Sequence, residues 1–125
     1  MANNYTDFSF EIYDLTGEEL FWLSERERCG FEMHTDVSSV CIYSDGEGDL
    51  AEVEELLLVF MQRFRPQGVV GFEFAQTCSK PRVGEFGGGA IVVYGSGHVE
   101  WTNTSDWLEA KLRDHERAQT EKGGE

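Results

Sequence analysis

The segment Thr77–Gly89 holds the residues whose types and spacing are most suggestive of chemistry. It carries Lys80 and Arg82 in an acidic chain and ends in three consecutive glycines. Cationic side chains bind phosphate or carboxylate oxygens, and glycines let backbone N–H groups approach an anion closely. The segment therefore predicts a small anion- or nucleotide-binding site, which an enzyme would also be able to use. Its candidate residues are Cys78, Ser79, Lys80, Arg82, Glu85, Gly87, Gly88 and Gly89.

The same segment also has a purely structural interpretation. A phosphate-binding P-loop places its glycines before the lysine and a helix after it, whereas here Lys80 precedes the glycines and a strand is expected to follow. A long loop folding over the sheet edge, with Phe86 in the core and the glycines in a bulge or tight turn, accounts for the pattern equally well. Both interpretations stay open at this stage.

Other reactive side chains do not form a recognisable constellation. Cys78 lies beside two cations, an environment that activates catalytic cysteines, but no histidine can be assigned to it as a base. The three cysteines and three histidines are too widely spaced for a zinc site. The carboxylates from Asp45 to Asp49 do not continue into the glycine and glutamate of a calcium-binding EF-hand. We expect no catalytic residues, no metal and no cofactor.

Negative charge is concentrated in the first half of the chain. Residues 1–60 contain fifteen carboxylates and two arginines, a net charge of −13, whereas residues 61–125 contribute only −1. Such a surface would repel phosphates, so we expect no direct binding to nucleic acid. It permits binding to a basic surface of a partner protein, although a merely solvated acidic face remains the alternative.

Carboxylates from two predicted helices form the candidate acidic face. Glu25 and Glu27 extend the same series, and the spacing of such groups in space would decide whether they imitate the phosphates of DNA. The members of the candidate face are Glu18, Glu19, Asp45, Glu47, Asp49, Glu52, Glu54 and Glu55.

The run Thr77–Ala90 resembles a motif of small acidic orphan proteins from bacteriophages and mobile elements of proteobacteria. A looser similarity extends over Tyr5 to Leu108, including the helix end Arg63–Pro66. The resemblance carries no established activity and no catalytic residue across, and it implies a mobile-element setting. Small acidic phage proteins often bind and block host proteins, including nucleic-acid-handling defence enzymes, so the resemblance implies a non-enzymatic inhibitor acting on a basic host protein.

Hydrophobic periodicity predicts an α+β fold in which an antiparallel sheet of four to six strands carries two or three helices on one side. A capping box at Thr16 and Glu19 starts the first helix, which should run to Arg28 and stop at Cys29–Gly30. Trp101 and Trp107 are expected in the core, and Trp22 there or at an interface. The other elements expected are strands Phe8–Ile12, Phe31–His34, Ser39–Tyr43, Val69–Phe74, Ala90–Tyr94 and His98–Trp101, a helix over Leu50–Phe64 capped by Asp49, and a helix from Asn103 or Thr104.

The length of 125 residues suits one domain, which we place at 1–116, followed by a frayed polar tail at 117–125. The sequence shows no secretory signal and no apolar run long enough to cross a membrane. Unpaired, widely spaced cysteines favour a cytoplasmic location. Whether the domain is a monomer or a dimer does not follow from the sequence.

Overall fold

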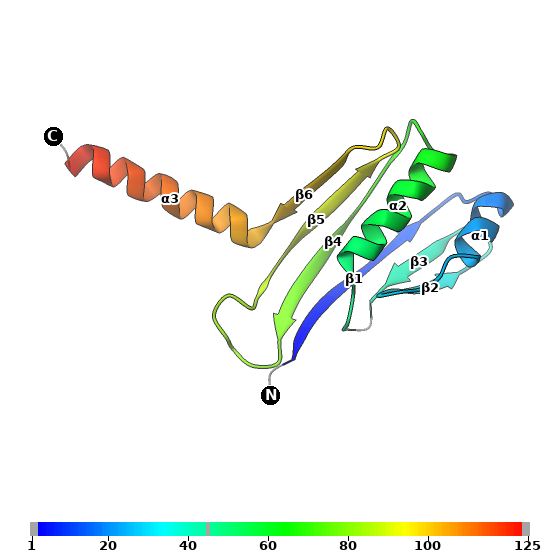
Figure 1. Ribbon diagram of the computed structural model, residues 1–125, viewed down its shortest axis with the longest axis horizontal. Coiled ribbons are helices and arrows are strands. Elements are labelled where there is room, and N and C mark those ends of the chain that lie inside the picture. The colour runs from blue at the N-terminus through cyan, green and yellow to red at the C-terminus, as the bar shows by residue number, and fades with distance from the viewer. Residues whose placement is uncertain (1–2, 45, 124–125) are drawn as a thin grey trace.

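The computed structural model describes residues 3–44 and 46–123, which form one antiparallel sheet of six strands and three helices (Figure 1). The strand order is β2-β3-β1-β4-β5-β6, which confirms the predicted α+β class. Within the described residues, no helix is both long and apolar enough to span a membrane. The elements are β1 (Asn4–Ile12), α1 (Gly17–Ser24), β2 (Glu32–Thr35), β3 (Val40–Tyr43), α2 (Leu50–Phe64), β4 (Val69–Cys78), β5 (Gly87–Tyr94), β6 (Val99–Asn103) and α3 (Thr104–Gly123).

The core lies between one face of the sheet and the helices α1 and α2. Alternation along β1 buries Phe8 and Ile12 and exposes Glu11, as a strand with one covered face requires. The apolar stripe of α2 supplies Val53, Leu57 and Phe60, none of which has any exposed surface. Burying such a stripe is the main stabilising contribution to a helix of this length, so the strongest helical pattern in the sequence is also the centre of the fold.

Helix α1 begins where its capping box predicts and ends earlier than predicted. The N–H of Glu19 donates to Oγ1 of Thr16 at 3.1 Å, and the N–H of Thr16 donates to Oε1 of Glu19 at 2.8 Å. The helix stops at Ser24, four residues short of Arg28. Beyond the helix, Gly30 lies beside the start of α2, where its carbonyl accepts the N–H of Asp49 at 2.8 Å.

Helix α3 does not join the core, and the expectation that Trp101 and Trp107 are buried is wrong. Trp101 is 46% exposed and Trp107 is 62% exposed. The side chain of Asn103 accepts the N–H of Asp106 at 2.7 Å, so the helix starts directly at the end of β6 with no reversing loop. It therefore projects away from the sheet (Figure 1). It continues to Gly123, beyond the residue at which the tail was expected to begin.

Candidate functional site

Helices α1 and α2 lie side by side and run in opposite directions, so each end of the pair brings together distant parts of the sequence. At one end, Arg65 follows α2 and meets Glu19 in the first turn of α1. At the other end, the connection from α1 to β2 passes the N-terminus of α2, where Gly30 contacts Asp49. Trp22 holds the two helices together, with its ring 6.0 Å from that of Phe60.

At the end where Arg65 meets Glu19, the two opposite charges neutralise each other in a contact that stabilises the fold. Arg65 Nε donates to Glu19 Oε2 at 2.9 Å, and its Nη2 donates to the carbonyls of Tyr13 and Asp14. Burial raises the pKa of Glu19, but the hydrogen bonds from Arg65 and Thr16, together with the charge of Arg65, outweigh it and leave the pKa below its usual value. Glu19 is only 5% exposed, so it cannot offer its charge to a partner.

The predicted acidic face is therefore not one surface. Glu18 and Glu19 lie at the Arg65 end, whereas Asp49, Glu52 and Glu55 lie at or near the start of α2. Including Glu19 in the face was wrong, because the capping box and the ion pair with Arg65 turn its side chain inward.

The remaining predicted members fall into three cases. Glu47 lines a separate hollow with Arg28 and Glu32, next to the start of α2. Glu54 is half-buried and lies on the flank of α2 that faces away from α1. Asp45 lies outside the described residues.

A hollow of about 250 Å³ lies between α1 and α2 at their acidic end, and we call it the α1–α2 groove. Its apolar floor and wall come from both helices and from the residue that precedes β2. The lining residues are Trp22, Arg26, Glu27, Phe31, Glu52, Glu55, Leu56 and Val59. The three carboxylates of this lining belong to the acidic series of the sequence, but the apolar wall has no signal there, because Phe31 comes from a different part of the chain than Leu56 and Val59.

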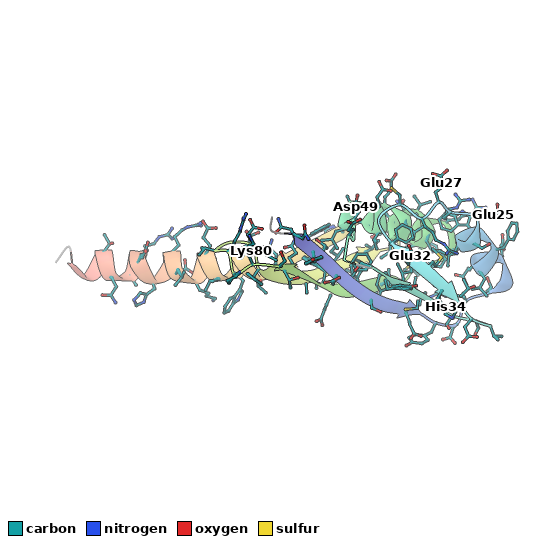
Figure 2. The ribbon with its side chains drawn as sticks, turned by 90° about the horizontal axis from the view of Figure 1, so that it is seen from below. Glu25, Glu27, Glu32, His34, Asp49 and Lys80 are labelled. Atoms are coloured by element: carbon teal, nitrogen blue, oxygen red, sulfur yellow. The ribbon has the colours of Figure 1, made fainter. Side chains whose placement is uncertain are left out.

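The rim of the α1–α2 groove carries unpaired negative charge. Within the described part of the chain, no lysine, arginine or histidine nitrogen lies within 4.0 Å of the carboxylates of Glu27, Glu52 or Glu55. Arg26 is the one cation of the lining, and its guanidinium stacks on the Trp22 ring, 4.5 Å from the centroid. Glu27 and Asp49 both point away from the sheet on its helical side (Figure 2). The end of the helix pair thus offers an apolar hollow framed by free carboxylates.

The three glycines of the segment lie in a strand, and the connection is shorter than expected. β4 continues to Cys78 and β5 begins at Gly87, which leaves only residues 79–86 as the connection. Gly87, Gly88 and Gly89 pair with Gln76, Ala75 and Phe74. A Cβ atom on Gly88 would lie 2.6 Å from the Phe74 carbonyl oxygen, and one on Gly89 would collide with the Thr102 carbonyl oxygen. The glycines therefore permit close strand packing and do not form a tight turn, and they also line a hollow of about 530 Å³ beside Thr104.

The cations of this segment are not brought together with the other candidates. Lys80 and Arg82 are exposed, and Lys80 lies far from Glu25 and Glu27 along the molecule (Figure 2). The hollow of about 340 Å³ beside the connection is lined by Glu85 and by neither cation. The expectation that Phe86 enters the core is wrong, because its side chain is 50% exposed.

The other predicted members of the loop site are also separated from the two cations. Cys78 is buried at the end of β4. Ser79 is hydrogen-bonded to the N-terminal segment, since its Oγ accepts the N–H of Asn3 at 2.8 Å. In the residues that the structure covers, no group of three or more histidine, cysteine, aspartate or glutamate side chains is arranged to hold a metal ion. Comparison with protein-family models, curated proteins and solved structures finds no match to this chain.

Proposed function

We propose that this protein is a non-enzymatic interaction module that binds a basic surface of a partner protein through the acidic end of its helix pair. The observation that carries the proposal is the set of unpaired carboxylates around the α1–α2 groove, in a half of the chain with a net charge of −13. Charge of one sign gathered over an apolar hollow combines steering with a place for an anchor, as protein interfaces require.

Association would begin with long-range attraction between the acidic end and the basic partner, followed by docking of apolar groups. If the basic surface of the partner normally holds nucleic acid, the protein would compete for it, as an inhibitor from a phage or mobile element would. The three cysteines are free thiols in the structure, which suits action in a reducing cytoplasm.

The test uses the immobilised 125-residue chain to recover partners from a bacterial host lysate, followed by direct measurement of binding to each purified candidate. Association should slow steeply as salt rises, because exposed charges are screened over about 8 Å at physiological ionic strength. The double variant Glu52→Lys/Glu55→Lys should lower the affinity at least ten-fold. The matched control, Asp114→Lys/Glu116→Lys on α3, makes the same charge change far from the helix pair and should have a much smaller effect.

Two results would contradict the proposal. One is direct binding of DNA or RNA by the chain itself, because the proposal requires a basic partner protein and not a phosphate backbone. The other is a purified partner whose affinity does not depend on salt and responds equally to the two charge-reversed variants.

A further inference from the structure

We infer that the α1–α2 groove is an anchor site for an arginine side chain in a basic, amphipathic segment of the partner. The inference rests on the proposed function and deepens it, because it names the occupant and the contacts that hold it. The groove would take the methylene stem of the arginine against its apolar wall and the guanidinium against its carboxylate rim.

The floor of the groove is suited to an aliphatic stem. Phe31 and Leu56 are buried beneath it, and Val59 stands at its side with 45% of its surface exposed. Trp22 closes the α1 side and is itself fixed by its contacts with Phe60 and Phe64. Long cationic side chains bury their methylene groups on apolar surface while keeping the charged head at a polar rim, which is the arrangement that this hollow offers.

The rim is suited to a guanidinium in particular. Glu52 and Glu55 rise from one helix and Glu27 from the segment after the other, so the hollow has carboxylates on two sides. Guanidinium binds carboxylates bidentately and stacks on aromatic rings, whereas ammonium does neither as well. Arg26 already displays the second chemistry inside this groove, where its guanidinium stacks on Trp22.

The size of the groove favours a side chain over a free small molecule. Its volume of about 250 Å³ lies below the ~300–1,000 Å³ of pockets that enclose drug-sized ligands. One anchor residue with its neighbours outside the hollow fits this volume and leaves the remaining basic residues of the segment to face the surrounding carboxylates.

The experiment uses isothermal titration calorimetry to measure binding of the 125-residue chain to a helical peptide with leucine on one face and arginine on the other. Its lysine counterpart is titrated in parallel. Val59→Trp fills the groove without changing the charge, and it should weaken binding of the arginine peptide about ten-fold. Glu52→Gln/Glu55→Gln should weaken it by a similar factor because two ion pairs are lost. The arginine peptide should bind the wild-type chain several-fold more tightly than the lysine peptide.

Two matched variants serve as controls and should bind like the wild type. Val69→Trp adds the same side chain at an exposed position outside the groove, and Asp114→Asn/Glu116→Gln removes the same charge from α3. Melting curves establish that every variant is folded, and Val59→Phe replaces Val59→Trp if the larger ring prevents folding.

The outcomes separate the inference from the proposed function. If Glu52→Gln/Glu55→Gln weakens binding and Val59→Trp does not, the groove inference is overturned while the acidic surface keeps its role. If the wild-type chain binds neither peptide, the groove inference fails, and recovery of partners from the lysate decides the proposed function separately. Equal affinity for the two peptides, or equal loss in Val69→Trp, also overturns the inference. So does a chain that sediments as a dimer without peptide and as a monomer in Val59→Trp, because a second copy would then occupy the groove.

Discussion

The acidic end of the helix pair and the β4–β5 connection differ in how the fold arranges their candidate residues. It brings those of the first region together and separates those of the second. The carboxylates Glu27, Glu52 and Glu55 are far apart along the chain and yet frame one hollow. The candidates Cys78, Lys80 and Gly88 are close along the chain and yet end up in a buried strand end, an exposed loop and a paired strand. Packing of α1 against α2 gathers distant residues, whereas the β4–β5 hairpin places Cys78 in one strand, Lys80 in the connection and Gly88 in the next strand.

The groove requires that α2 packs on the sheet through its buried face, and Leu57→Asp tests that packing. Leu57 has no exposed surface, so the substitution buries an unpaired carboxylate and should cost more than ~4 kcal/mol, which is on the scale of the stability of a whole domain. Circular dichroism should show an unfolded chain at room temperature. Val59→Asp, at a position with 45% exposure, should remain folded. A Leu57→Asp variant that melts like the wild type would show that α2 does not pack on the sheet.

The ion pair at the neutral end of the helix pair is tested by Glu19→Gln. The change removes the charge that Arg65 faces, and since Arg65 is 30% exposed at its side chain the expected loss is about 2 kcal/mol, between the values for surface and buried pairs. Urea denaturation measures it at neutral pH. Glu18→Gln on the exposed face of α1 should change stability by less than ~0.5 kcal/mol.

The pH dependence of the same pair has a definite sign. The pKa of Glu19 is lowered in the folded state, so its stabilising contribution is fully present above the unfolded value of 4.5 and is lost as the pH falls through the folded value. The stability difference between the wild type and Glu19→Gln should therefore shrink on acidification below about 4.5 and stay constant above it. A difference that grows in acid would contradict the assigned pairing.

The structural role of the glycines is tested by Gly89→Ala. The added methyl group would collide with the backbone of Thr102, so β6 must shift, at a cost of roughly 1–3 kcal/mol. Gly17→Ala, where nothing lies within 4 Å of the added atom, should instead be neutral or slightly stabilising. Thermal melts of the two variants test whether Gly89 is required for close strand packing. Unchanged stability in Gly89→Ala would contradict that packing role.

The smallest effect is expected for Lys80→Ala/Arg82→Ala. Both side chains are exposed, so stability should stay within ~0.5 kcal/mol of the wild type. The wild-type chain should show no thermal shift with inorganic phosphate or nucleotides, because binding to the native state would raise its stability by mass action. A phosphate-dependent shift that disappears in the double variant would reinstate an anion site at this connection.

Local chemistry in the sequence was sufficient to place most elements. Helix α2 begins after Asp49 and ends at Phe64 as its stripe and cap predict, and the capping box of Thr16 and Glu19 forms. Asp49, for example, accepts the N–H of Ala51 at 3.1 Å, a contact between residues two positions apart in the chain. These features depend on neighbours within a few residues, so composition and spacing determine them.

Tertiary structure alone decided which side chains share a surface. Glu19 was assigned to the acidic face and is instead held inward by Arg65, a residue separated from it by the whole of α2. Trp107 has the spacing of a core residue and is exposed, because no reversing turn returns α3 to the sheet.

The acidic character of the first half, the strand and helix types and the caps thus belong to the sequence by itself. The α1–α2 groove exists only because antiparallel packing places the end of α1 beside the start of α2. The physical reason is that periodicity reports the face a residue occupies on its own element, whereas a site depends on distances between elements that only packing sets.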